Sequence, residues 1–382
     1  MMSLKSKREL LEAIRPRYLK AEKVEKQKML DEFTSATGYH RKHAIRVLKN
    51  RVQGQNRLKG KTKTYKTIYR GEVVQVLEQI WEIYGRICSK RLQPFLPEAI
   101  KVLERCQEIE LSQETKELLL KISSASIDRC LRPVRIKSPH GLSTTKPGSL
   151  LKKSIAIRTF TEWSEERPGF MEIDLVAHCG NTTEGQYLNT LTCTDLCTGW
   201  MALTALPRRT QQAVCDAIHR MRQRLPFPLL GIDSDNGGEF INDLLYRYCL
   251  DEQITFTRSR PYQKNDQAHV EQKNWSVVRH TVGYDRWETE QERVLLESIY
   301  NDLQLYINFF QPSFKLIAKE RVGNRTFKRY DTAKTPYQRV LERQDISLEA
   351  KARLMNLYLH LNPAELRRRI DQKTAKLWNL SR

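Results

Sequence analysis

The sequence predicts an α/β domain with a mixed sheet, preceded by all-helical modules and followed by a basic helical tail over 311–382. Before residue 137 the apolar side chains recur at helical spacing, whereas from Pro168 onward β-branched and aromatic runs alternate with amphipathic stretches. Between the two textures, residues 138–164 are dense in Pro, Gly, Ser and Thr, which is typical of an interdomain linker. A chain of 382 residues has room for about two to three domains.

The basic charge is concentrated near the N-terminus. The chain has 66 Lys and Arg against 45 Asp and Glu, a formal net charge of +21. Residues 1–70 hold 20 of the basic and 6 of the acidic side chains, so 14 of the 21 net charges lie there. Because each neutralised phosphate releases counterions, this asymmetry favours an N-terminal region that binds nucleic acid.

The first domain, 1–58, is predicted to contain a helix-turn-helix. Two amphipathic helices, over 26–35 and 39–49, are separated by a glycine-containing turn. A plain three-helix bundle has the same spacing, but the local charge favours DNA binding. The candidate contacts are basic residues on the outer face of the second helix: Arg41, Lys42, Arg46 and Lys49.

A second helical module is predicted over 71–137. We expect helices over 72–84, from Pro97 to about Cys106, and over 113–121 with Ser112 as its N-cap. A short basic helix follows, and its Arg129 and Arg132 are DNA-binding candidates in a second, weaker helix-turn-helix pattern.

The α/β domain is predicted to span 165–310. Three apolar runs within 169–207 are expected strands, and two more follow within 225–261. Helices are expected over 211–224, 242–251, 266–280 and 289–309, the last with a capping box. Three strands, a helix, a strand, a helix and a further strand indicate a mixed sheet.

The eight cysteines are predicted to be buried, reduced thiols of a cytoplasmic protein. A metal site at Cys193 and Cys197, near His178 and Cys179, is the weaker alternative because the spacing is loose for zinc. The sequence contains no apolar run of 18 residues, so no membrane partner is expected.

Three carboxylates occupy positions at which a buried sheet does not tolerate an unpaired charge. Asp174, with Glu172, lies on one face of the strand MEIDLV; Asp235 follows the apolar run LLGIDS; and Glu271 lies on the helix after the polar loop that starts at Ser259. Converging carboxylates repel each other unless divalent cations lie between them, and Mg²⁺ prefers such oxygen ligands.

These residues resemble the D,D-35-E signature of retroviral integrases and of bacterial insertion-sequence transposases. Asp235 and Glu271 are separated by 35 residues, and the blocks SDNGGEF and RPYQKNDQAHVEQKN match the second and third motifs of that family. The resemblance covers about residues 165–310. It implies a five-stranded RNase H-like core in which Asp174, Asp235 and Glu271 are catalytic and hold two Mg²⁺ ions, for which Mn²⁺ can substitute.

The resemblance also implies an activity and partners. The protein is expected to cut double-stranded DNA at the terminal inverted repeats of a mobile element and to join the 3′ ends to target DNA by in-line displacement. We expect a homo-oligomer on DNA, in the bacterial cytoplasm at the nucleoid. The chain lacks the His-His…Cys-Cys zinc module of retroviral integrases, and no strand-rich C-terminal barrel is expected.

Further DNA contacts are expected around the third carboxylate, although a solvated basic face is an almost equal alternative. The candidates are Lys264, Asn265, Lys273, Asn274 and Arg279. Asp233 could exchange roles with Asp235, and Glu172 is expected to pair with a basic neighbour. Trp200 and Trp275 are expected in the core.

Two other functions remain open at this point. One is a transposase-derived DNA-binding regulator with an inactive core, against which the intact carboxylate triad argues. The other is an RNase H-like nuclease that cuts without joining, against which the tandem N-terminal modules argue.

Overall fold

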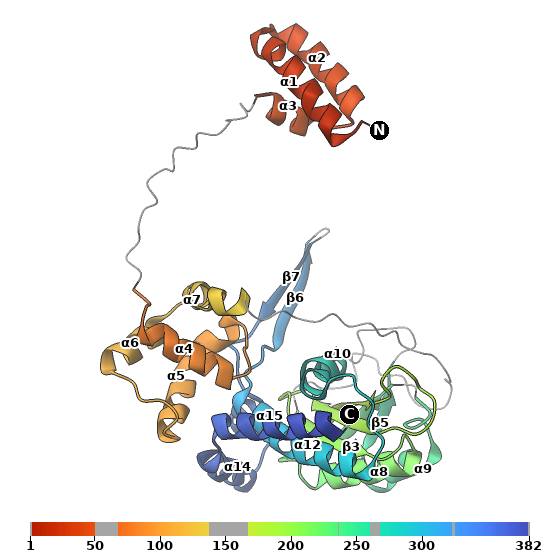
Figure 1. The fold of residues 1–382 in the computed structure, drawn as a ribbon. Helices are drawn as coiled ribbons and strands as arrows, with labels where there is room; N and C mark the ends of the chain where they lie inside the picture. Colours follow the sequence, from red (N-terminus) through yellow and green to blue (C-terminus); the bar gives the residue numbers. More distant parts are fainter. Residues whose placement is uncertain are drawn as a thin grey trace. The chain divides into compact units, whose positions relative to one another are not determined.

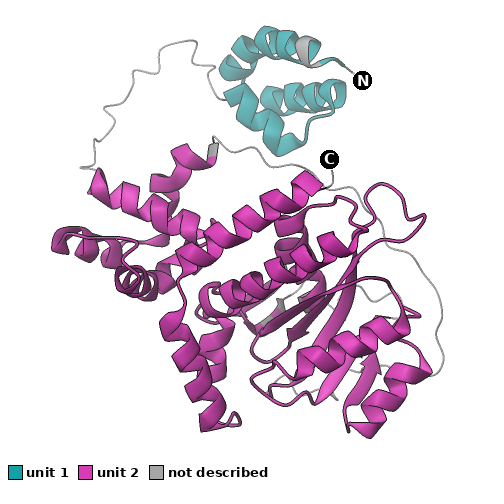
Figure 2. Ribbon diagram, turned by 60° about the horizontal axis from the view of Figure 1, so that its bottom comes forward, with its two compact units in different colours: residues 1–67 teal, residues 68–382 magenta. Residues whose placement is uncertain are grey.

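The computed structural model describes residues 2–49, 68–136, 167–235, 237–259, 268–322 and 325–380. The chain divides into two compact units, residues 1–67 and 68–382 (Figure 2). Figure 1 labels most of their helices and strands.

The first unit is a three-helix bundle. Its helices are α1 (Leu4–Lys20), α2 (Lys23–Thr37) and α3 (Arg41–Lys49), packed around the fully buried Phe33. Gly38 ends α2 in the left-handed conformation with φ of 69°, which glycine adopts without steric cost. The predicted pair of helices joined by a glycine turn is therefore confirmed.

The second unit begins with four helices: α4 (Glu72–Ile83), α5 (Ser89–Arg105), α6 (Gln113–Lys121) and α7 (Ser124–Ile136). Ser112 caps α6 through a side-chain hydrogen bond from the Thr115 N–H, as predicted. The prediction that Pro97 opens a helix is wrong, since α5 starts at Ser89 and contains both Pro94 and Pro97. Its apolar face, with Leu92, Phe95, Leu96, Ala99 and Leu103 buried, holds the helix together across both prolines.

A five-stranded mixed sheet forms the centre of the second unit. Its strands are β1 (Phe170–Ala177), β2 (Asn189–Asp195), β3 (Met201–Leu206), β4 (Gly231–Ser234) and β5 (Thr255–Arg258). The strand order is β3-β2-β1-β4-β5. The β1–β2 and β2–β3 pairs are antiparallel, whereas β4 pairs in parallel with both β1 and β5. This is the sheet that the sequence predicted.

Helices cover both faces of the sheet. On one face, α8 (Gln211–Arg222) and α9 (Asp243–Asp251) share a core with Met171, Ile173 and Ile232. On the other, α12 (Glu290–Phe310) shares a core with β3, with α4–α7 and with the C-terminal helices. Its N-terminus has the predicted capping box between Thr289 and Glu292.

Helix α12 also protects β3, the strand at the edge of the sheet. The outward N–H groups of Met201, Leu203 and Ala205 donate to side chains of α12, with donor–acceptor distances of 2.8, 3.1 and 2.7 Å. The acceptors are Asn308, Gln304 and Glu297. An edge strand with its backbone groups satisfied in this way does not recruit a further strand.

The C-terminal segment is helical, as predicted, and it contains a hairpin that was not expected. The strands β6 (Leu316–Val322) and β7 (Arg325–Tyr330) form an antiparallel ribbon of their own. Helices α13 (Pro336–Glu342), α14 (Leu348–His360) and α15 (Pro363–Leu380) follow, and α15 packs along α12. None of the helices in the described ranges is both long and apolar enough to span a membrane.

Candidate active site

The strand register brings the first two predicted carboxylates together. Strands β1 and β4 run in parallel, and Ile173 lies beside Ser234 in the register. Asp174 and Asp235 are each the next residue, so Asp174, within β1, lies beside Asp235, which directly follows the carboxyl end of β4. Ligand and catalytic groups in open α/β sheets gather at this edge.

The third carboxylate comes from a short helix that is tied to the same strand. Helix α10 (Ala268–Lys273) carries Glu271. The backbone N–H of Val270 donates to Oε2 of Glu172 at 3.0 Å, and Glu172 is buried on β1. This bond fixes the start of the helix beside the sheet. The expected pairing of Glu172 with a basic side chain stays a prediction.

The helix changes its winding immediately after Glu271. A π-helix, η1 (Asn274–Arg279), follows α10 directly, and α11 (His280–Val282) ends the segment. Single π-turns inside helices are frequent at functional sites. Here Asn274 donates from Nδ2 to Oδ2 of Asp174 at 2.6 Å, so a second bond joins this segment to β1.

Electrostatics couples the three carboxylates. The pKa of Asp174 is raised to about 7, first by burial and then by the negative charges of Asp235 and Glu271. Hydrogen bonds from the Leu175 N–H and from Asn274 act in the opposite direction. A carboxyl group whose pKa is raised by neighbouring carboxylates is typical of a site that binds cations or transfers protons.

Asp235 has neighbours that the sequence did not single out. Burial raises its pKa, while the Gly237 N–H donates to Oδ1 at 2.9 Å and favours the charged form. Glu239 raises the pKa of Asp235 and Arg209 lowers it, and these two form an ion pair of 2.6 Å. A Cβ at Gly237 would lie 2.6 Å from the Glu239 carboxylate, so a larger residue there would displace that carboxylate.

The oxygen atoms of the three carboxylates are of the chemical type that binds a hard cation. Carboxylate oxygens from Asp174, Asp235 and Glu271 are the ligands that Mg²⁺ prefers. Oδ1 of Asn274, next to Asp174, is buried and has no hydrogen-bond partner among the described residues. Within those residues, however, no group of three or more His, Cys, Asp and Glu side chains is close enough to hold a metal ion. The three carboxylates therefore lie in one site, but they do not surround a common metal position.

The predicted DNA-binding residues of the helical modules lie on the surface. In the first unit the side chains of Arg41, Lys42, Arg46 and Lys49 are exposed. In the second unit Arg129 and Arg132 on α7 are exposed as well. The structure leaves their binding role a prediction.

The predicted DNA-binding residues near Glu271 differ in their surroundings. Lys264 and Asn265 lie outside the described residues. Lys273 is partly buried, and burial together with the charge of Arg91 lowers its pKa to about 8. Arg279 donates from Nη2 to the Ala177 carbonyl at 2.7 Å and lies 4.7 Å from the Tyr284 ring centroid, which ties η1 to the end of β1.

One tryptophan prediction is confirmed and the other is wrong. Trp200 is buried. Trp275 is 62% exposed, because the π-helix turns Val277 and Val278 into the core instead. A pattern based on 3.6 residues per turn misplaces side chains after such a change of winding.

The competing acidic residues have structural roles. Asp233 is buried within β4 and accepts a bond of 2.6 Å from the Thr257 hydroxyl. Asp195 closes the turn after β2 by accepting from the N–H groups of Gly169 and Thr198, at 2.8 and 2.7 Å. Both point into the protein, which leaves Asp235 as the carboxylate at the end of β4.

The cysteines are free thiols. Cys193 and Cys197 are buried, and burial raises the pKa of both. His178, considered with them as a metal ligand, is bonded from Nε2 to the Thr190 hydroxyl at 2.7 Å. Burial lowers the pKa of His178 to about 3. These surroundings give no support to zinc at this position.

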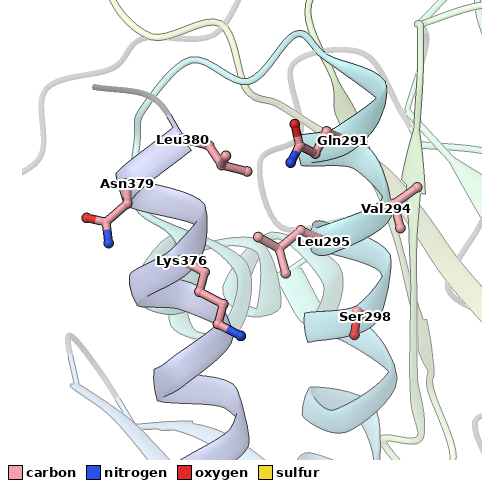
Figure 3. Close-up of a pocket in the computed structure, with 7 residues that line it drawn as sticks. All are labelled: Gln291, Val294, Leu295, Ser298, Lys376, Asn379 and Leu380. Carbon is pink, nitrogen blue, oxygen red and sulfur yellow. The ribbon is translucent and has the colours of Figure 1, made fainter.

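A cavity of about 530 Å³ lies away from this chemistry, between α12 and α15 (Figure 3). It has no carboxylate, imidazole or thiol on its wall. Its lining residues are Gln291, Val294, Leu295, Ser298, Lys376, Asn379 and Leu380. We therefore assign the reactive site to the sheet edge at Asp174.

Comparison with known proteins agrees with the fold. Residues 164–264 match the family model of the integrase core domain, a range that contains β1–β5 with Asp174 and Asp235. The chain belongs to the integrase core family. The uncharacterized protein y4rM of Sinorhizobium fredii is 40% identical to this integrase-core protein over 340 residues, which cover 88% of this chain and 96% of that relative.

Two solved structures are also similar to the integrase-core protein. The catalytic core domain of BIV integrase is 19% identical, covers 46% of this chain and 94% of that chain, and has a TM-score of 0.31. The HTLV-2 integrase catalytic core domain in complex with magnesium is 15% identical, with coverages of 38% and 90% and a TM-score of 0.29. The match to the integrase core domain makes the chain a member of the transposase and integrase class, with an RNase H-like core.

Proposed function

We propose that this protein is a DNA transposase. It binds the terminal inverted repeats of a mobile element, hydrolyses phosphodiester bonds at the element's ends and joins the 3′ ends to target DNA. The observation that supports this most strongly is the coupling of Asp174, Asp235 and Glu271, which come from two parallel strands and a helix and raise the pKa of Asp174 together.

The three carboxylates would act as metal ligands. Asp174, Asp235 and Glu271 would hold two Mg²⁺ ions between them. Bound there, two Mg²⁺ ions would lower the pKa of the attacking water or 3′-hydroxyl and offset the charge on the leaving oxygen. Displacement at phosphorus is then direct, and no Ser or Tyr nucleophile is required.

Other residues of the chain prepare this site. Asn274 orients the Asp174 carboxylate, and the Gly237 N–H orients that of Asp235. Glu172 holds the start of α10 and thereby the position of Glu271. Lys273, two residues further along, supplies a positive charge where a DNA phosphate would approach.

Binding would begin at the N-terminal unit. Arg41, Lys42, Arg46 and Lys49 form an exposed basic surface on α3, the second helix of the helix-turn-helix pattern. Arg129 and Arg132 on α7 would extend the contact. Two binding regions in one chain suit long terminal repeats, and we propose that the protein acts as a homo-oligomer on DNA in the bacterial cytoplasm.

The DNA on both sides of the gene provides the test. We expect inverted repeats bounded by a short direct duplication of the target. A plasmid fragment carrying those ends, incubated with the protein, Mg²⁺ and a second plasmid, should yield molecules joined through the fragment's 3′ ends. Cut ends without any joined product would contradict the transposase proposal and favour a nuclease.

A further inference from the structure

The ribbon formed by β6 and β7 is strongly basic. Its sequence from Leu316 to Tyr330 contains five Lys and Arg residues and one acidic residue, Glu320. The register places Lys319 opposite Lys328.

The ribbon projects from the rest of the second unit (Figure 1). Lys328 and Arg329 are exposed, and neither has an ion pair or side-chain hydrogen bond with any described residue. Phe327 is 56% exposed. No described helix or strand packs extensively on the ribbon. These side chains therefore do little for the fold and are available to a partner.

Hydrogen bonds fix the base of the ribbon to the rest of the second unit. Asp331 accepts from the Lys315 N–H at 2.7 Å and from Nη1 of Arg339 at 2.5 Å, and Arg339 also donates to the Ser313 carbonyl. Nζ of Lys315 donates to the Cys197 carbonyl, in the turn after β2, at 3.2 Å. The ribbon therefore has a defined direction with respect to the catalytic sheet.

A further cation lies near this base. The ring centroids of Phe314 and Tyr330 are 6.0 Å apart, and the Arg91 guanidinium lies 6.0 Å from the Phe314 ring centroid. Positive charge is thus present at the base of the ribbon as well as along it, as a bound phosphate backbone would require.

We propose that the β6–β7 ribbon is an arm that binds duplex DNA on the way to the carboxylate site, through Lys328 and Arg329. A two-stranded ribbon fits the major groove of B-DNA, and its basic side chains reach the phosphates on either side. The inference rests on the proposed function, because it assigns the arm to the DNA that the core processes. A second copy of this chain is the competing occupant, but it has the same positive ribbon and the same net charge.

The test measures binding of the full chain to a 40-base-pair duplex of random sequence by fluorescence anisotropy, over a series of KCl concentrations. The variant K328Q/R329Q should lower the slope of log Kd against log salt by about 2, since each lost phosphate contact removes about 0.9. At low salt its affinity should fall by about tenfold or more. K328R/R329K, which keeps both charges, should bind like the wild type.

The matched control is R220Q/R247Q, which removes two exposed arginines from α8 and α9. An equal loss of affinity in the control would overturn the proposal, since it would show an effect of net charge alone. Unchanged binding by K328Q/R329Q would also overturn it, and a change of oligomeric state without a change in DNA binding would assign the ribbon to copy–copy contact. Failure of the wild type to cleave DNA, with arm-dependent binding intact, would count against the transposase function and leave the arm standing.

Discussion

Asn274 donates a hydrogen bond of 2.6 Å to the carboxylate of Asp174, across 100 positions of sequence. The donor stands at the first position of the π-helix η1, and the acceptor stands on β1, the central strand of the sheet. The same bond favours the charged form of Asp174, which burial disfavours. Asn274, expected from the sequence to contact DNA, is therefore placed to orient a catalytic carboxylate.

Replacing Asn274 by alanine should slow DNA cleavage by about 10–100-fold, the range typical of residues that orient metal ligands. Loss of the bond also raises the pKa of Asp174 further, so the acidic limb of the pH–rate profile should move to higher pH. Single-turnover cleavage across pH 5.5–9 measures both effects. Ser276→Ala, at an exposed position of the same π-helix, is the control, and a profile that does not move in Asn274→Ala would contradict the orienting role.

Asp174 should reduce the stability of the metal-free protein at high pH. Its pKa is about 7 in the folded protein against an ordinary value of 3.8, so the folded state holds the proton more tightly than the unfolded state. The contribution of Asp174 to stability is then most favourable below pH 4 and is lost as the pH rises through 7. Asp174→Asn should therefore raise the free energy of unfolding at pH 8 in EDTA by roughly 1–3 kcal/mol, and the melting temperature should rise with it.

The same difference should shrink as the pH is lowered to 4. Thermal melts of wild type and Asp174→Asn at pH 4, 6 and 8 measure it. Equal melting temperatures at pH 8, or a lower one for the variant, would show that the charged Asp174 side chain does not destabilise the folded protein.

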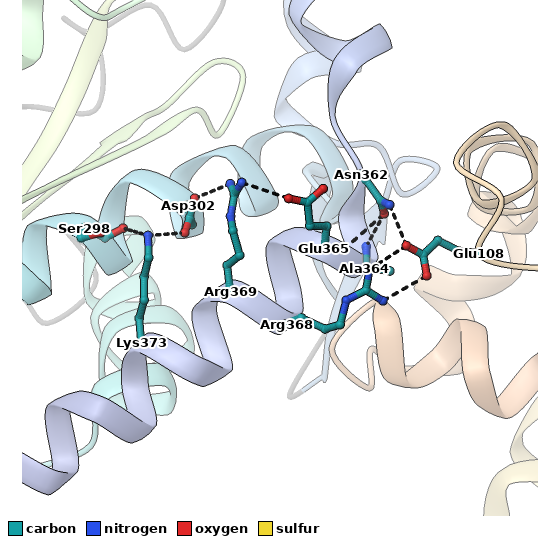
Figure 4. A network of polar contacts seen from close by, with 9 residues as sticks. All are labelled: Glu108, Ser298, Asp302, Asn362, Ala364, Glu365, Arg368, Arg369 and Lys373. Atoms are coloured by element: carbon teal, nitrogen blue, oxygen red, sulfur yellow. Dashed lines mark hydrogen bonds and ion pairs between the residues drawn. The ribbon is translucent and has the colours of Figure 1, made fainter.

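Asp302 joins α12 to the C-terminal helix α15 through two ion pairs (Figure 4). It is nearly buried on α12 and accepts from Arg369 at 2.5 Å and from Lys373 at 2.6 Å, both on α15. Asp302→Asn should lower the free energy of unfolding by about 1–3 kcal/mol, because two cations lose their anion at a partly buried position. Urea unfolding measures this.

An exposed ion pair supplies the comparison for Asp302. Glu349 and Arg353 on α14 are paired at 2.6 Å, with both side chains largely exposed. Glu349→Gln should change the stability by no more than about 0.5 kcal/mol. If both variants lost equally little, α15 would be held by its apolar contacts alone.

The order of the elements in the core could be predicted because each has a local signal. The strand MEIDLV buries Met171 and Ile173, and the Thr289–Glu292 capping box begins α12 as expected. The candidate triad could be named because its blocks and spacing are features of the chain itself. Neither kind of inference needs to know which distant segments meet.

The parts that were missed depend on tertiary contacts. Helix α5 continues through Pro97 because its apolar face is buried, which outweighs the lost hydrogen bond. Trp275 is exposed because the helix winds more widely after Lys273. The β6–β7 ribbon lacks the apolar alternation of a half-buried strand, since nothing described covers it. The partners of Glu172 and Asn274 lie about 100 residues away, beyond any local pattern.

The central claim is that Asp174, Asp235 and Glu271 form one catalytic site. Its most direct test is Mg²⁺-dependent cleavage of DNA carrying the element's ends by wild type, Asp174→Asn, Asp235→Asn and Glu271→Gln, with binding of the same DNA measured alongside. Asp251→Asn, on the exposed end of α9, is the control. We predict that each of the three substitutions abolishes cleavage and leaves DNA binding intact, while the control cleaves normally. Cleavage at the wild-type rate by Glu271→Gln would contradict the account.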